Sequence, residues 1–189
     1  MTLLIAGLVL FLGIHSVSIV APGWRDAQLA RRGEAGWKGA YSVVAIIGLA
    51  LIVIGYGLAR QAPVVLYTPP AGLRHVALLL MLPVFPLLLA AYLPGRIKAT
   101  VKHPMLLAVK FWALAHLLAN GTLADLLLFG GLLAWAVADR ISLKRRAARS
   151  TPAAPPRRAN DLISVVGGLA LYAVTVGVLH RWLFGVAPL

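Results

Sequence analysis

The chain has 189 residues, of which 61% are apolar and 12% charged, with a mean hydropathy of +0.89. A soluble domain would carry about 25% charged residues, and several apolar runs reach the roughly 18–20 residues that cross a bilayer. These numbers exclude a sizeable soluble domain and predict a multispanning membrane protein.

The basic residues lie mostly in short loops between the apolar runs. The formal net charge of +13 would otherwise suggest nucleic-acid binding, but basic loop residues set membrane topology and contact anionic lipid. We therefore expect membrane lipid, and no nucleic acid, as their partner. The chain has no cysteine, which excludes disulfides, thiolate metal ligands and thiol chemistry.

We expect an all-α, polytopic helix bundle that forms a single membrane domain over residues 1–189. A basic flexible loop, 142–158, precedes the final transmembrane helix, which Asn160 or Asp161 is expected to cap. The expected spans are Thr2–Val20, Ala40–Ala59, Leu73–Leu93, Met105–Ala119, a fifth from Thr122 to near Arg140, and Leu162–Phe184.

The polar segment Pro22–Gly39 separates the first two spans. Its Trp24 and Trp37 are expected at the headgroup level, where tryptophan is enriched. Between them, the stretch from Arg25 to Glu34 is predicted to form a short helix on the membrane surface.

Small and cyclic residues predict how two of the spans behave. Gly48, Gly55 and Gly57 in the second span allow another helix to approach closely. Pro83 and Pro86 in the third span remove backbone donors and predict a kink or break.

The segments that flank the fourth span carry local signals. Pro94–Pro104 is expected to be a basic loop, and Asn120-Gly121 a tight turn. Thr122 and Asp125 are spaced as a capping box for the fifth span.

The charge distribution predicts the orientation. The loops after the first, third and fifth spans hold fourteen lysines and arginines, whereas the opposite side holds Arg60, Arg74 and Arg181. Under the positive-inside rule both termini lie outside, which for a bacterial inner membrane means the periplasm.

The fourth span holds three ionisable residues, His103, Lys110 and His116, in an otherwise apolar run. Such groups are costly at membrane depth and by default indicate function. Trp112, His116 and Asn120 follow at i, i+4 and i+8, so they share one helix face.

Histidine without cysteine favours haem over a hydrolytic metal site, which usually needs a third ligand or a carboxylate. Haem needs one or two imidazoles, an apolar slot between helices and cations for its propionates. The candidate ligands are His15, His75, His103 and His116, and the candidate propionate partners are Lys110, Arg74 and Arg96. His180 and His75 also lie beside arginines near span ends, where an interfacial role is the simpler interpretation.

Five motifs resemble the NnrU family of bacterial integral membrane proteins. They cover roughly residues 1–140 and read LFLGIHS, APGWRD, GWKGAYS, KHPMLLAVKFWALAHLLANG and LLFGGLLAWAVADR. The resemblance implies a bacterial inner-membrane location and a role in denitrification, together with components of the nitrite and nitric oxide reductases.

The plant 15-cis-ζ-carotene isomerase is a distant relative of that family and uses haem b. Two of its essential histidines are similar in context to His15 and His116, and a further one to His103. The resemblance implies haem b bound through His15 and His116, with Lys110 near a propionate and His75 or His103 as alternate ligands. If the protein is an enzyme, a haem-dependent, redox-type isomerase-like activity is implied. The plant enzyme exchanges a cysteine for histidine at its iron, and this chain has no cysteine.

Position along the helices leaves the ligand pair open. His103 and His116 are about 20 Å apart along one helix, and depth alone would pair His15 with His103 and His116 with His75. Two other functions also remain: an anion or small-molecule transporter that uses Lys110, and a non-catalytic assembly partner of a membrane reductase.

Overall fold

The computed structural model describes residues 1–146 and 153–188. Regular structure in these ranges is helical, apart from one isolated bridge between Val65 and Thr122. The elements are α1 Thr2–Val20, α2 Pro22–Ala59, α3 Leu73–Met81, α4 Val84–Tyr92, α5 Arg96–Val101, α6 Pro104–Ala119, α7 Leu123–Asp125, the π-helical turn η1 Leu126–Gly130, α8 Gly131–Ser142, α9 Asn160–Val174, the π-helical turn η2 Thr175–Leu179 and α10 His180–Phe184.

Several helices are long and apolar enough to cross a membrane. In the described part of the chain these are Thr2–Val20, Pro22–Ala59, Leu73–Tyr92 and Asn160–Phe184, with Pro104–Ala119 as a shorter apolar helix. The protein is an all-helical membrane bundle, which confirms the predicted class. Most helix ends lie close to the predicted span ends, but α2 begins at Pro22, well before the predicted Ala40. The number of spans and the side of the termini stay predictions.

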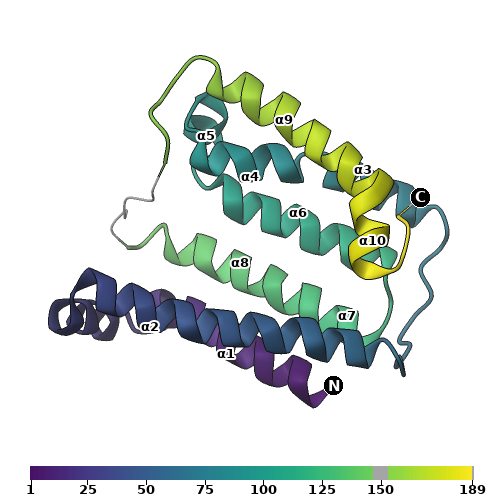
Figure 1. The fold of residues 1–189 in the computed structure, drawn as a ribbon, viewed down its shortest axis with the longest axis horizontal. Helices are drawn as coiled ribbons and strands as arrows, with labels where there is room; N and C mark the ends of the chain where they lie inside the picture. The colour runs from purple at the N-terminus through teal and green to yellow at the C-terminus, as the bar shows by residue number, and fades with distance from the viewer. Residues whose placement is uncertain (147–152, 189) are drawn as a thin grey trace. The chain divides into compact units, whose positions relative to one another are not determined.

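The chain forms two compact units. Unit 1 comprises Met1–Tyr67 and Gly121–Ser142, and unit 2 comprises Thr68–Asn120 and the described residues from Leu143 onward. In unit 1, α1 packs along α2 and contacts α8 (Figure 1). In unit 2, α4 packs against α9 and α6, and α3 packs against α6.

Glycines bring α1 and α2 into backbone contact. A Cβ at Gly48 would lie 2.8 Å from the backbone nitrogen of Phe11, and one at Gly55 would overlap the backbone of Leu4. A Cβ at Gly57, in contrast, would have no neighbouring atom within 4 Å. The close approach predicted for Gly48 and Gly55 is therefore confirmed, whereas Gly57 takes no part in it.

The polar start of α2 folds back on itself at Gly33. That residue has φ +70° and ψ 170°, a conformation found essentially only for glycine, which costs an L-residue about 1–3 kcal/mol. Trp24 and Trp37 would be about 20 Å apart along a straight helix, yet their ring centroids are 5.9 Å apart. The predicted short helix therefore exists, beginning at Pro22, and its reversal brings the two tryptophans together.

The break predicted in the third span is present. Helix α3 ends at Met81 and α4 begins at Val84, so the interruption falls at Pro83. The basic segment after α4 is not a simple loop as predicted, because Arg96–Val101 forms the helix α5.

The connection between α6 and α7 differs from its prediction. The expected tight turn at Asn120-Gly121 is wrong: Asn120 is extended, with φ −131° and ψ 144°, and Gly121 does not have a positive φ. Gly121 instead accepts a backbone hydrogen bond from Leu66 at 2.8 Å. The capping box of Thr122 and Asp125 is confirmed.

The start of α9 also differs from its prediction. Neither Asn160 nor Asp161 is the N-cap, because the helix begins at Asn160 after Ala159 and no side chain caps it. Asp161 instead accepts hydrogen bonds from the backbone of Arg96 and Ile97, at 2.8 and 3.0 Å. It thereby caps α5, a helix far away in the sequence. The flexible loop predicted for 142–158 lies partly outside the described residues.

Candidate functional site

His15 lies three-quarters of the way along α1, in unit 1. Its Nδ1 donates a hydrogen bond to the Phe11 carbonyl at 2.7 Å, because a carbonyl can only accept. In the neutral ring the lone pair then resides on Nε2, to which no described residue makes a hydrogen bond. A histidine that ligates a metal usually donates its other N–H to such a partner.

Aromatic rings surround this imidazole. The centroid of its ring lies 4.2 Å from that of Phe11, 5.2 Å from Tyr41 and 5.7 Å from Trp135. The ring of Trp37 lies next to that of Tyr41, with 6.5 Å between the two ring centroids. The surroundings of His15 are therefore mainly aromatic and come from α1, α2 and α8, and the Asp139 carboxylate of α8 is close enough to interact with it electrostatically.

Trp135 adds an unusual feature beside His15. Its indole Nε1 is buried and has no hydrogen-bond partner among the described residues. An unpaired buried donor costs about 1–3 kcal/mol, so it is a group to which a ligand acceptor could bind.

His116 in unit 2 repeats the arrangement of His15. Its Nδ1 donates to the Trp112 carbonyl at 2.8 Å, and its ring lies 5.1 Å from the Trp112 ring. Both histidines thus carry an aromatic residue four positions earlier and a hydrogen bond to that residue's carbonyl. Asn120, on the same face as predicted, donates its side-chain amide to the His116 carbonyl at 2.9 Å.

The hydrogen bond alone does not distinguish a ligand. His180 makes a similar bond, from Nδ1 to the Val186 carbonyl at 2.8 Å, but it starts α10 close to the C-terminus. His15 lies inside the apolar helix α1, five residues before its end, whereas His116 lies in the last turn of the apolar helix α6.

The remaining predicted residues lie in unit 2. Lys110 is half-buried in α6 and makes no hydrogen bond or ion pair with any described residue. His103 precedes the first residue of α6, thirteen residues before His116, so the two cannot bind one metal ion. His75 is exposed in the first turn of α3.

The predicted pair comes from both units: His15 belongs to unit 1, whereas His116 and Lys110 belong to unit 2. Within the described ranges, no group of three or more histidine or acidic side chains could hold a metal ion. Each histidine is therefore a candidate for a centre that needs one or two protein ligands.

Asp125 has a second partner that its sequence spacing did not indicate. The residue is 4% exposed and accepts hydrogen bonds from the Thr122 backbone and hydroxyl, at 2.9 and 2.6 Å. The hydroxyl of Tyr56 in α2 donates to its other oxygen. All three contacts stabilise this carboxylate, so we assign it to structure.

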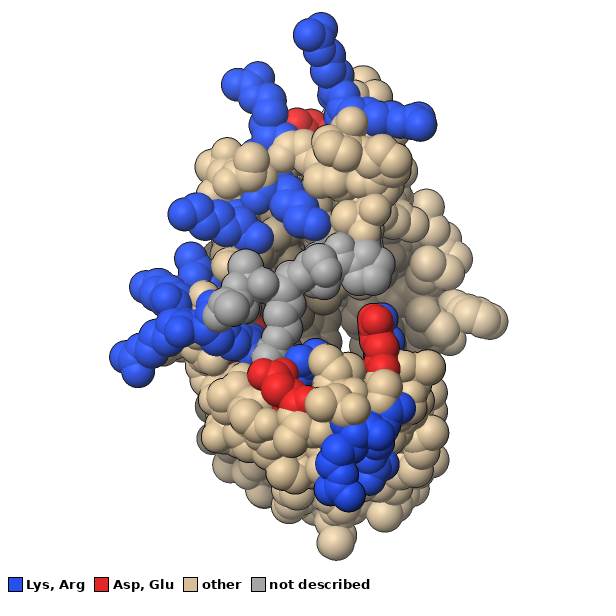
Figure 2. Space-filling view, turned by 90° about the vertical axis from the view of Figure 1, so that its left-hand side faces the viewer, with Lys and Arg blue, Asp and Glu red and all other residues tan. Residues whose placement is uncertain are grey.

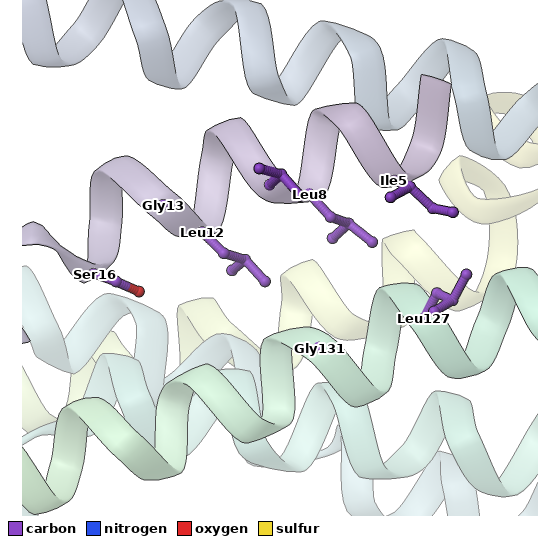
Figure 3. Close-up of a pocket in the computed structure, with 8 residues that line it drawn as sticks. Ile5, Leu8, Leu12, Gly13, Ser16, Leu127 and Gly131 are labelled. Carbon is purple, nitrogen blue, oxygen red and sulfur yellow. The ribbon is translucent and has the colours of Figure 1, made fainter. Parts of the chain in front are cut away.

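An open apolar groove of about 390 Å³ runs along α1 in unit 1. Figure 3 shows Leu8 and Leu12 of α1 directed toward η1 and α8, from which Leu127 and Gly131 complete the wall. Ser16, the residue after His15, supplies the only hydroxyl of the lining. The helix that carries His15 thus offers apolar surface next to it.

Tyr41 and Trp135 were missed by the sequence reasoning. Trp37 and Tyr41 are spaced i and i+4, which places them on one helix face and could have indicated an aromatic cluster. No local pattern indicates Trp135 beside His15, since these residues lie on different helices.

Comparison with known proteins supplies the family. No curated protein and no solved structure matches this chain. The family model described as NnrU protein matches residues 3–188, beyond the 1–140 that the motifs cover. The chain therefore belongs to the NnrU protein family.

Proposed function

We propose that the protein binds haem b within the membrane, and that His15 and His116 would hold its iron. The observation that carries the proposal is the shared geometry of these histidines. In each, Nδ1 donates to the carbonyl four residues earlier, which orients the ring and places the lone pair of the neutral tautomer on Nε2. The support for the proposal comes from the surroundings of His15 within unit 1 and from those of His116 within unit 2.

The surroundings of His15 support the proposal because they offer apolar surface for a porphyrin. Phe11, Tyr41 and Trp135 provide aromatic surface, and the groove along α1 provides aliphatic surface. The unpaired indole N–H of Trp135 is a donor available to a carboxylate. A bound haem b would supply a redox-active iron.

Lys110 is the proposed partner of a haem propionate. A half-buried ammonium in an apolar helix needs an anion, and the described residues provide none for it. A carboxylate would form a charge-assisted hydrogen bond with this group.

An absorption spectrum of the detergent-purified full chain, with haem supplied, tests the proposal. A Soret band is expected; His15→Ala or His116→Ala should shift it and accelerate haem loss, and the double variant should abolish binding. His180→Ala is the matched control and should change neither, because that histidine makes a similar hydrogen bond but is interpreted as an interfacial residue beside Arg181. Absence of a Soret band in the wild type would refute haem binding. Spectral changes confined to His75 and His103 variants would refute the ligand pair.

We further propose that the protein acts in the bacterial inner membrane during denitrification, in contact with nitrite or nitric oxide reductase components. Membership of the NnrU family supports this context. A strain that lacks the protein should accumulate nitrite or nitric oxide under denitrifying conditions, and the wild-type gene should restore reduction. Normal reduction in the deletion strain would contradict the role, whereas restoration by the double histidine variant would separate the role from haem.

A further inference from the structure

A basic depression of about 710 Å³ lies at one end of unit 2, where α4 ends and α9 begins. Its lining includes Arg96, Arg157 and Arg158, which are exposed, and one acidic residue, Asp161. Figure 2 shows lysine and arginine side chains at this end of unit 2, in the upper part of the view.

The three arginines carry charge that is not neutralised within the described chain. Arg25 pairs with Asp26 and Lys38 with Glu34, and within the described ranges no ion pair involves the arginines of the depression. Asp161 accepts backbone hydrogen bonds from Arg96 and Ile97. Its carboxylate is directed toward these N–H groups, and the guanidinium groups remain available to an anion.

The depression has a fixed backbone frame. Asn160 is 3% exposed, and its amide donates to the carbonyls of Pro94 and Pro155, at 2.9 and 3.1 Å. Ala154 donates its backbone N–H to the Tyr92 carbonyl at 2.9 Å. These bonds attach the segment before α9 to the end of α4.

Gly95 completes this frame. A Cβ at that position would overlap the Asp161 carboxylate, so the small residue allows the acid to reach the backbone of α5. The segment that carries Arg157 and Arg158 is thereby held next to Arg96. Basic residues that only set the membrane topology would not need their backbone to be held in place by these hydrogen bonds.

Apolar surface adjoins the depression. Leu162 and Ile163, directly after Asp161, are 65% and 50% exposed, and Tyr92 at the end of α4 is 54% exposed. Both helices belong to apolar spans, and aromatic residues favour the headgroup level at span ends. A molecule in the depression could therefore place its charge among the arginines and its chains along α9.

We propose that this depression binds the phosphate headgroup of an anionic membrane lipid. Guanidinium groups bind phosphate oxygens in a bidentate manner, and the exposed apolar start of α9 favours a lipid over free phosphate. The site is independent of the histidines and of haem.

Binding of labelled phosphatidylglycerol to the detergent-purified full chain tests this site, with phosphatidylcholine as the neutral lipid and inorganic phosphate as competitor. The variant Arg96→Gln/Arg157→Gln/Arg158→Gln should weaken phosphatidylglycerol binding at least about tenfold, because each basic residue near an anionic surface contributes roughly 1 kcal/mol. Each single substitution should weaken it about fivefold, which gives a second measure should the triple variant fold poorly.

The matched control is Arg31→Gln/Lys144→Gln/Arg145→Gln. It removes the same charge from exposed residues of the same predicted membrane side, and it should change binding less than about twofold. An equal loss in both triple variants would show diffuse attraction and overturn the site. Equal affinity for both lipids would also overturn it. Full displacement by millimolar inorganic phosphate would identify free phosphate as the ligand and overturn the lipid assignment.

Discussion

The hydroxyl of Tyr56 in α2 donates a hydrogen bond to the carboxylate of Asp125 in α7. Asp125 also forms the capping box with Thr122, so one buried acid both starts a helix and joins it to α2. The segment that follows α2 is paired there as well, since Leu123 donates its backbone N–H to the Val64 carbonyl at 2.8 Å. This corner of unit 1 is therefore held by side-chain and backbone contacts together.

Removing either partner should destabilise this corner. Tyr56→Phe should lower stability by about 1 kcal/mol, and Asp125→Asn by about 1–3 kcal/mol, because an amide places a donor toward groups that already donate. Thermal unfolding of the purified protein measures both. Tyr92→Phe is the control, since that tyrosine is 54% exposed, and it should leave the melting temperature unchanged. A similar drop in all three variants would contradict the assigned role of the hydrogen bond.

Gly55→Ala should separate α1 from α2, whereas Gly57→Ala should not. The added methyl group would overlap the backbone of Leu4 in the first case and meet open space in the second. Overpacking typically costs about 1–3 kcal/mol, while alanine for glycine on an open helix face gains about 0.5–1 kcal/mol. Melting temperatures should therefore shift in opposite directions. Equal shifts would mean that α1 and α2 do not pack at this glycine.

The reversal at Gly33 can be tested by cross-linking, because the chain contains no native cysteine. Cysteines that replace Trp24 and Trp37 should react with a short bifunctional reagent, since the native rings lie 5.9 Å apart. In a straight helix these positions are about 20 Å apart. Adding Gly33→Ala should reduce the yield, because alanine disfavours the positive φ found there. Gly39→Ala, with open space on its side, is the control. Efficient cross-linking in the Gly33→Ala background would argue against the glycine requirement.

The predicted orientation is tested by reporter fusions. A reporter placed after Ala119 should lie on the periplasmic side, and one after Arg158 on the cytoplasmic side, because fourteen basic residues flank the spans on that side. An alkaline phosphatase and a fluorescent-protein reporter at each site give complementary signals. If both sites report the same compartment, the six-span topology is wrong.

The sequence by itself determined the helical class, the approximate ends of the apolar helices, the interruption at Pro83 and the capping box of Thr122 and Asp125. Each depends on neighbours along the chain. Apolar length is set by the bilayer, proline removes a donor wherever it stands, and a capping box closes over three residues. These effects depend only on residues that are close together in the sequence, and the structure confirms them.

Tertiary structure decided which groups meet across helices. Asp161 has the spacing of a cap for its own helix, yet it binds the backbone of Arg96 instead, because Gly95 lets that segment approach. The rings of Trp135 and His15 lie side by side, although the two residues are about 120 positions apart in the chain. No periodicity encodes such pairs, since they depend on how complete helices pack, and packing depends on the shapes of both surfaces at once.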